Sequence, residues 1–276
     1  MSPSCNSPTD PQTYLVYNHT QSLLDGQNVF DSAVYPGFTT DIPAAWDWRN
    51  QGALNPVQNQ GMCRSCWAFS TTSVLESLFF IKHNELRKFS EQFAVNCNHG
   101  LFEEDVNSGC AGGYPESAFI YNQFGGIPGV REVSSSDACT NDPSPLIVTG
   151  TYMIHPGDNV ALKYAVFKSP VVVELDASSP SFQHYTSGII TTIDSPNSIR
   201  VQCSSLFDDA THAVTIVGYG TQPATDGASS IDYWIVRNSW GSSWGENGYF
   251  RMERSSSAND AGVCGIANFG AFASIE

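Results

Sequence analysis

The two halves of the chain carry different hydrophobic patterns. Before about residue 170 the apolar residues recur at helical spacing, and after it they form short β-branched or aromatic runs bounded by Gly, Asn and Ser. The expected helices are 66–83, 90–95, 115–124 and 158–168, and the expected strands are 171–175, 213–219, 233–237 and 249–252. Helices followed by strands predict an α+β chain in two lobes rather than an alternating parallel sheet. A cleft between two lobes is the natural position for a site.

The composition of the chain argues against several classes of partner. Its 276 residues, 41% of them hydrophobic, are enough to fill a large core. Twelve Lys and Arg against 27 Asp and Glu give a net charge of −15, which disfavours binding to nucleic acid or to an anionic membrane. No run of 18 apolar residues is present to span a bilayer. We therefore expect neither a nucleic-acid partner nor a membrane partner.

Residues 1–40 differ from the rest of the chain. They are rich in Ser, Pro, Thr, Asn and Asp and contain only short apolar pairs. This pattern is typical of a segment with little core of its own, so we interpret it as an N-terminal extension or a propeptide remnant. The first 30 residues lack a basic start followed by an apolar stretch, and any secretory signal is expected to lie outside this chain.

The number and spread of the cysteines indicate the compartment. Eight are present, at positions 5, 63, 66, 97, 110, 139, 203 and 264. So many dispersed cysteines favour disulfides in an oxidising compartment, and the triplet Asn18-His19-Thr20 matches an N-glycosylation acceptor. Together they predict a secreted, lysosomal or vacuolar protein.

The stretch Cys63-Arg64-Ser65-Cys66 is compatible with three kinds of chemistry. A redox dithiol requires a preceding βαβ unit, which the flanking sequence lacks. Half of a zinc site requires a second close pair of ligands, whereas Cys97 and Cys110 stand far apart with only His99 near. The third reading is nucleophilic catalysis by Cys66.

Cys66 stands at the expected start of a helix. Unpaired N–H groups and the positive end of the helix dipole at this position stabilise a thiolate. A thiolate nucleophile also needs a cationic partner that protonates the leaving amine, and histidine is the usual type. His212 is the candidate, because it lies at the mouth of the expected strand 213–217, where a side chain can face a cleft.

Several blocks surround these two residues. They are 60–70 (QGMCRSCWAFS), 109–115 (GCAGGYP), 211–214 (THAV), 218–220 (GYG) and 233–249 (YWIVRNSWGSSWGENGY). In this order, from about Ile42 to the C-terminus, they resemble the papain family of cysteine peptidases. The separation of Cys66 and His212 also falls in the range of about 130–150 residues typical of a papain-like pair.

The resemblance implies a fold and a domain organisation. It implies a papain-like two-lobe fold with a helical N-terminal lobe, a central helix starting at Cys66 and a β-barrel-like C-terminal lobe. The active-site cleft lies between the lobes. We expect the peptidase domain at 41–276, with one lobe mainly at 52–155 and the other mainly at 156–276.

The resemblance also implies catalytic roles for individual residues. Cys66 is the nucleophile, and His212 is its ion-pair partner and general acid/base. Asn238 orients the imidazole through its side-chain carbonyl, and Trp240 shields that hydrogen bond from water. The Gln60 side chain and the Cys66 backbone N–H donate to the oxyanion of the tetrahedral intermediate.

Further residues are implied to line the substrate cleft. Gly112 and Gly113 border the path of an extended substrate, because missing side chains let two backbones pair. The main specificity pocket is implied to contain Tyr114, Pro115, Glu174, Ala210, Ala213 and Phe269. Glu174 stands where relatives have a small apolar residue. We therefore expect Arg or Lys to be accepted at the second substrate position, alongside hydrophobic residues.

Two further departures from the family pattern and one absent insertion bear on the expected activity. Arg64 stands where glycine is usual, beside the pocket for the residue that precedes the scissile bond, and we expect it to favour small or acidic residues there. Thr211 replaces an acidic or amide residue, so the pH profile is expected to differ from the family norm. Between Gly113 and His155 there is no long insertion with paired histidines, which favours an endopeptidase over a dipeptide-releasing enzyme.

The resemblance also organises the cysteines. It implies the pairs Cys63–Cys110, Cys97–Cys139 and Cys203–Cys264, and it leaves Cys66 free as a nucleophile. Cys5 has no partner in this scheme and is unpaired, linked to another chain or paired with a prosegment residue.

The function implied is that of a cysteine endopeptidase that forms a thioester acyl-enzyme. No metal and no organic cofactor is expected. The expected partners are protein or peptide substrates and a propeptide or cystatin-like inhibitors, and the expected state is a monomer. The alternative is a catalytically silent binding or structural homologue.

Overall fold

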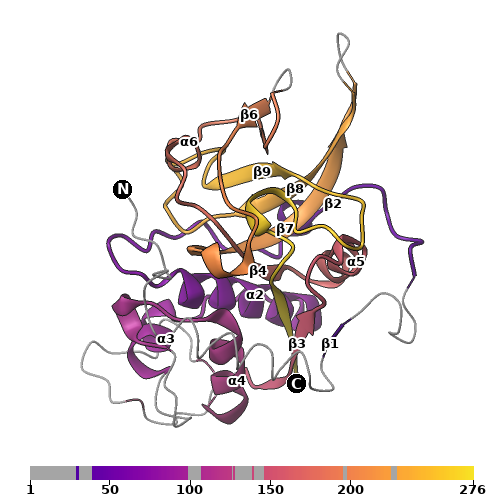
Figure 1. The fold of residues 1–276 in the computed structure, drawn as a ribbon. Helices are drawn as coiled ribbons and strands as arrows, with labels where there is room; N and C mark the ends of the chain where they lie inside the picture. Colours follow the sequence, from indigo (N-terminus) through magenta and orange to yellow (C-terminus); the bar gives the residue numbers. More distant parts are fainter. Residues whose placement is uncertain are drawn as a thin grey trace.

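The computed structural model describes residues 29–30, 39–98, 107–125, 127, 139, 146–194, 198–224 and 229–276 (Figure 1). The α-helices are α2 (Cys66–His83), α3 (Glu91–Cys97), α4 (Pro115–Gly125), α5 (Asn159–Lys168) and α6 (Pro180–Gln183). The 3-10 turns are η1 (Trp48–Gln51), η2 (Gly109–Ala111), η4 (Phe207–Asp209) and η5 (Val263–Gly265). The strands are β1 (Val29–Phe30), β2 (Trp46–Asp47), β3 (Val148–Ile154), β4 (Val171–Leu175), β5 (Ile189–Thr191), β6 (Ser198–Arg200), β7 (His212–Gln222), β8 (Ile231–Arg237), β9 (Tyr249–Glu253) and β10 (Gly270–Ile275). Each helix and strand expected from the sequence has a counterpart, which confirms the α+β class.

The described strands form one sheet that the two halves of the chain share. Their order is β1-β3-β10-β4-β7-β8-β9-β5-β6, and β2 pairs with β7. This order is an open path, so the barrel-like second lobe expected from the sequence is corrected to an open sheet. The reason is that β10 and β3 continue the sheet beyond β4, where α2 and α4 pack against them instead of allowing closure (Figure 1).

The apolar residues form two main cores, one in each half. One core joins β4, β7, β8 and β9 to α5 and α6, and Trp234 and Phe250 are fully buried in it. The other joins α2 and α4 to β3 and β10, and its buried residues include Leu75 and Phe119. Helix α2 lies between the sheet and the other helices, so it is buried on most of its surface. This central position holds the first residue of α2, Cys66, inside the molecule.

Helix α2 has the bounds predicted from its sequence. It starts at Cys66 after Ser65 and ends at His83, because Asn84 adopts a left-handed conformation with φ 54°. Asparagine tolerates this conformation better than most residues do. The start of α2 is the element that positions the candidate nucleophile.

Strands β4 and β7 fix the position of His212. They pair antiparallel, with Leu175 opposite His212 and Glu174 opposite Ala213. His212 is the first residue of β7, at the strand mouth predicted from the sequence. Residues opposite one another in such a pair have side chains on the same face of the sheet, so Glu174 and Ala213 share a face.

A short part of the predicted N-terminal extension joins the main core. Strand β1 pairs in parallel with β3, and the Phe30 carbonyl accepts a hydrogen bond of 3.0 Å from the His155 N–H. The Phe30 ring stacks on Tyr164 and meets Phe272 edge-on, at centroid distances of 5.8 and 5.7 Å. This contact could not be predicted from the composition of residues 1–40, because it depends on one buried aromatic residue, Phe30. Cys5 and Asn18 lie outside the described residues.

None of the helices in the described part of the chain is both long enough and apolar enough to cross a bilayer.

Candidate active site

Cys66 lies at the N-terminus of α2 and is fully buried. Its Sγ accepts a hydrogen bond of 3.2 Å from the backbone N–H of Ala213, the residue that follows His212. The side chains of Cys66 and Ala213 also pack together. The first turn of α2 contains no acidic residue to oppose a negative charge on the sulfur. The fold therefore brings together the two residues that the sequence analysis pairs as nucleophile and base.

The oxidation state of Cys66 differs from the expectation. Cys66 is disulfide-bonded in this structure, so the expected free thiol is corrected. The other described cysteines pair among themselves, and the partner of Cys66 therefore lies outside the described residues. A sulfur held in a disulfide cannot act as a thiolate nucleophile, so this state must be reduced before the sulfur can attack.

His212 and Asn238 form a buried hydrogen-bonded pair. The Nε2 of His212 lies 2.8 Å from the Oδ1 of Asn238, and both residues are almost fully buried. Because Oδ1 only accepts, Nε2 carries the proton in this arrangement. The other ring nitrogen, Nδ1, has no hydrogen-bond partner among the described residues. One ring nitrogen of His212 is thus fixed by Asn238, and the other forms no hydrogen bond within the described part of the chain.

Trp240 covers one face of the histidine ring. The two ring centroids lie 4.7 Å apart at an interplanar angle of 27°. Phe182 and Trp244 meet Trp240 edge-on and hold it in place. Exclusion of water by these rings strengthens the hydrogen bond between His212 and Asn238.

Burial controls the charge of His212. Burial lowers the pKa of His212 to about 4, against the opposing effect of the hydrogen bond to Asn238, which raises it. The imidazole is therefore neutral above about pH 4 in this oxidised state. A negative thiolate beside the ring favours the imidazolium, because an opposite charge nearby stabilises the charged form.

Gln60 is held at three points. Its Nε2 donates to the Cys63 carbonyl at 2.9 Å, and its backbone N–H donates to the Ser239 carbonyl at 2.9 Å. Its Oε1 accepts from the Ser239 hydroxyl at 2.6 Å. The Ser239 N–H also donates to the Asn238 Oδ1 at 2.8 Å, so Ser239 links Gln60 to the residue that orients the imidazole. The sequence analysis missed Ser239, although its place directly after Asn238 in the block 233–249 was a usable signal.

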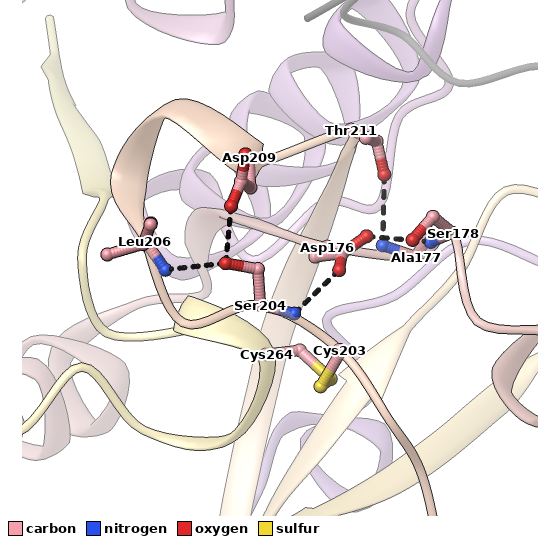
Figure 2. The surroundings of a disulfide bond; sticks show 9 residues. All are labelled: Asp176, Ala177, Ser178, Cys203, Ser204, Leu206, Asp209, Thr211 and Cys264. Atoms are coloured by element: carbon pink, nitrogen blue, oxygen red, sulfur yellow. Dashed lines mark hydrogen bonds between the residues drawn. A yellow bond between two sulfur atoms is a disulfide. The ribbon is translucent and has the colours of Figure 1, made fainter.

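The segment that precedes His212 is tied to the end of β4 (Figure 2). The Asp176 carboxylate accepts hydrogen bonds from the backbone N–H groups of Ser178 and Ser204, at 2.9 and 2.8 Å. The Thr211 hydroxyl accepts a hydrogen bond of 3.0 Å from the Ala177 N–H. The disulfide Cys203–Cys264 lies beside these contacts and anchors the start of the same segment. The Thr211 side chain thus fixes the backbone directly before His212.

Comparisons with known proteins agree with this arrangement. A family model described as papain family cysteine protease matches residues 42–274. The chain belongs to the papain family of cysteine proteases. It is 38% identical over 234 residues to Germination-specific cysteine protease 1 of Arabidopsis thaliana. That alignment covers 82% of this chain and 56% of the Arabidopsis protein, so the chain spans little more than half of that relative's length.

Solved structures of papain-family proteases have the same fold. Bromelain from Ananas comosus in complex with the inhibitor E64 has a TM-score of 0.69 and 32% identity, over 85% of this chain and 100% of bromelain. The ragweed pollen allergen Amb a 11, a cysteine protease solved in its proform, has a TM-score of 0.76 and 31% identity. The second comparison covers 100% of this chain and 76% of the allergen chain. The fold is therefore papain-like, with an open sheet.

Two glycines of this papain-family chain occupy positions that larger residues tolerate poorly. Gly112 has φ 132°, which L side chains rarely adopt. A Cβ on Gly113 would lie 2.4 Å from the Asn107 Oδ1 and 2.9 Å from the Trp67 indole. Neither the N–H nor the carbonyl of Gly113 forms a hydrogen bond to the described residues. Its backbone is thus suited to pairing with an extended peptide.

Glu174 lies close to a second buried carboxyl that the sequence analysis missed. Glu174 is 5% exposed on β4, and Glu116, in the first turn of α4, is fully buried. Burial raises the pKa of Glu174 well above its usual value, and the nearby charge of Glu116 raises it further. The two carboxyls come from opposite halves of the papain-family fold. A charged residue at a buried position of the expected helix 115–124 was the signal for Glu116.

The remaining residues implied for the specificity pocket occupy nearby elements. Tyr114 and Phe269 are buried, and Phe269 directly precedes Gly270, which pairs with Val173 of β4. Pro115 is the first residue of α4, and Ala210 ends η4 two residues before His212. Of these residues, Ala213 packs on Cys66, and Glu174 lies opposite Ala213 in the sheet.

Arg64 is partly buried beside the nucleophile. Its backbone N–H donates to the Cys110 carbonyl at 3.3 Å. Its guanidinium forms no ion pair with the described residues.

The structure contains the three disulfides that the family resemblance implies. They are Cys63–Cys110, Cys97–Cys139 and Cys203–Cys264. Cys63 therefore anchors the loop before α2 and takes no part in a dithiol with Cys66. In the described ranges, no group of three or more His, Cys, Asp or Glu side chains is arranged to hold a metal ion.

Proposed function

We propose that this chain is a cysteine endopeptidase that hydrolyses peptide bonds through Cys66 and His212. The observation that carries the proposal is the buried contact of Cys66 Sγ with the amide that directly follows His212, whose Nε2 is bound by Asn238 at 2.8 Å. A nucleophile, a base and an orienting group in this arrangement are sufficient for acyl transfer.

The chemistry proceeds in two steps. After reduction, the Cys66 thiol gives its proton to His212, and the thiolate attacks the carbonyl carbon of the scissile peptide bond. The Gln60 amide and the Cys66 N–H stabilise the oxyanion, the C–N bond breaks, and His212 protonates the leaving amine. Water then loses a proton to His212 and attacks the thioester, which releases the carboxylic acid and the Cys66 thiolate.

Labelling of the reduced protein tests the proposal directly. An epoxide-based thiol inhibitor is expected to add to Cys66, and a peptide with both ends blocked is expected to be cleaved at an internal bond. The variants Cys66→Ser and His212→Ala provide the controls and are expected to lack both reactions. Absence of an adduct on Cys66 in the folded, reduced protein overturns the proposal and favours a silent homologue.

The buried acid Glu174 supports a preference at the second substrate position. It shares a sheet face with Ala213, which packs on Cys66. We propose that this pocket accepts Arg or Lys as well as hydrophobic side chains, because a cation offsets the cost of a buried carboxylate. In a peptide library, Glu174→Gln is expected to cleave peptides with a basic residue at this position roughly tenfold less efficiently than the parent does. Cleavage of peptides with a hydrophobic residue there is expected to stay unchanged. The proposal is contradicted if the parent and Glu174→Gln both cleave only peptides with a hydrophobic residue at the second substrate position.

Arg64 supports a second preference. We propose that its unpaired guanidinium favours small or acidic residues immediately before the scissile bond. With the same library, Arg64→Gly is expected to lose the preference for acidic residues immediately before the scissile bond. It is also expected to cleave peptides with larger residues at that position. An unchanged profile at that position contradicts the assignment, whereas a change at the second position alone points to an indirect effect through the cleft.

The remaining assignments follow from the same family membership. We propose protein or peptide substrates, inhibition by a propeptide or by cystatin-like proteins, and a monomeric state. The inhibitor-bound bromelain and the allergen proform support binding of inhibitors and propeptides in this family. The three disulfides support a secreted, lysosomal or vacuolar location. The division into an extension at 1–40 and lobes mainly at 52–155 and 156–276 is likewise part of the proposal.

A further inference from the structure

A small polar cavity lies between α2 and β7, and Asn238 forms part of its wall. Its volume is about 10 Å³, which is room for a single ordered water. The polar side chains on its wall include Ser70, Ser73, Glu91, Thr215, Arg237 and Asn238. A cavity of this size with a polar wall is hydrated in proteins, whereas apolar cavities stay dry.

Three groups on this wall have no partner within the described part of the protein. They are the Ser73 hydroxyl, the Nη1 of Arg237 and the Nδ2 of Asn238. The three residues are 5%, 6% and 3% exposed, so bulk water does not reach these groups. Buried donors and acceptors without a partner are rare in native proteins, because each loses its hydration.

Asn238 and Arg237 each form hydrogen bonds through another atom of the same side chain. The Asn238 Oδ1 accepts from both His212 and Ser239, and the Nη2 of Arg237 donates to the Pro56 carbonyl at 2.8 Å. These contacts fix one end of each side chain. The atoms that remain without a partner among the described residues are Asn238 Nδ2 and Arg237 Nη1, and both residues line the cavity.

We propose that the cavity binds one ordered water that joins Asn238, Arg237 and Ser73. The water accepts hydrogen bonds from Asn238 Nδ2 and Arg237 Nη1 and donates to the Ser73 hydroxyl. The Asn238 amide is then held at both ends, with its oxygen on His212 and its nitrogen on the water. Ser73 and Arg237 are thereby positioning residues for His212, a role that rests on the proposed peptidase function.

Substitution of Ser73 by a side chain that fills the cavity tests the proposal. Ser73→Val replaces the hydroxyl by methyl groups that displace the water. In the reduced enzyme, kcat is expected to fall about tenfold, with KM within about twofold of the parent value, because misplacement of a catalytic group acts on the chemical step. The pH profile of kcat/KM is expected to shift as well, because the orientation of Asn238 sets the pKa of His212.

Thr72→Val is the matched control. Thr72 is the neighbouring residue on α2, is fully buried, and its hydroxyl also lacks a partner in the described structure, but it does not line the cavity. The control is expected to keep the parent kcat, KM and pH profile. If Ser73→Val behaves like Thr72→Val, the proposal is wrong.

A high-resolution crystal structure of the parent protein gives a second, independent readout. A water within hydrogen-bond distance of Asn238 Nδ2, Arg237 Nη1 and Ser73 Oγ supports the proposal, and a dry cavity overturns it. This readout remains decisive where Ser73→Val does not fold. It also separates the two proposals, because an inactive parent protein with a hydrated cavity contradicts the peptidase function and not the water site.

Discussion

At the scale of single residues, Ser239 and Glu116 show how neighbours set the properties of the candidate site. Ser239 forms hydrogen bonds to both Gln60 and Asn238, so the proposed oxyanion donor and the amide that contacts His212 share one support. Glu116 lies near Glu174, and its charge adds to the effect of burial in raising the pKa of the Glu174 carboxyl. A carboxyl whose pKa is raised in the folded state makes stability depend on pH.

The stability of the protein is expected to reveal the protonation of Glu174. Its folded pKa is raised, so its contribution to stability is fully present below the ordinary value of 4.5 and is lost as pH rises toward the folded value. Glu174→Gln keeps the size of the side chain and cannot ionise. The melting temperature of the variant relative to the parent is therefore expected to increase between pH 4.5 and pH 8.

A matched control uses an exposed glutamate. Glu85 has 58% of its side chain exposed, in a surface ion pair with Arg87. Glu85→Gln is expected to give a difference in melting temperature that hardly changes over the same pH range. If Glu174→Gln shows the same flat response as Glu85→Gln, the folded carboxyl of Glu174 is ionised like an ordinary one.

At the scale of elements, the helices start and end where local chemistry allows. Helix α5 starts after Asp158, whose Oδ1 accepts hydrogen bonds from the N–H groups of Val160 and Ala161, at 3.1 and 2.9 Å. Helix α3 starts in the same way after Ser90, whose hydroxyl accepts from the Phe93 N–H at 3.0 Å. Such caps satisfy backbone donors that have no partner within the helix.

Removal of the cap at α5 is expected to destabilise the protein. Asp158→Ala removes the acceptor of one buried and one partly buried N–H group and is expected to lower the free energy of unfolding by about 1 kcal/mol, whereas Asp158→Asn retains an acceptor and most of the stability. Urea unfolding of both variants and of the parent protein measures this difference in the free energy of unfolding. Equal losses for alanine and asparagine would show that the charge of Asp158, and not the cap, stabilises α5.

At the scale of the whole molecule, the oxidation state decides whether the site can react. Cys66 is buried and disulfide-bonded, and His212 beside it is neutral above about pH 4. Reduction of one disulfide supplies the thiolate and, with it, the charge that favours the imidazolium.

Activity is expected to depend on a reductant. Without one, peptide hydrolysis and alkylation of Cys66 by iodoacetamide are both expected to be absent, and both are expected to appear together on mild reduction. Peptide mapping after alkylation identifies the modified cysteine, and the peptides of the pair Cys203–Cys264 serve as an internal control for overreduction. Full hydrolysis by the unreduced protein would show that Cys66 is not held in a disulfide in solution.

The sequence by itself determined the features that depend on nearby residues. The start of α2 at Cys66 and the cap of α5 at Asp158 follow from local backbone chemistry, and the position of His212 at a strand mouth follows from the apolar run after it. Ordered motifs around Cys66, His212 and Asn238 carried the family assignment. These signals are readable because each is contained within a few consecutive residues.

Only the tertiary structure decided the contacts between distant residues. The bond between Gln60 and Ser239, the approach of Glu116 to Glu174, and the packing of Phe30 against Tyr164 join positions far apart in the chain. The open sheet belongs to the same group, because β3 and β10 extend it toward helices from the other half. No pattern of propensity or spacing encodes such contacts, since the packing of the two cores and the pairing of the strands bring these residues together.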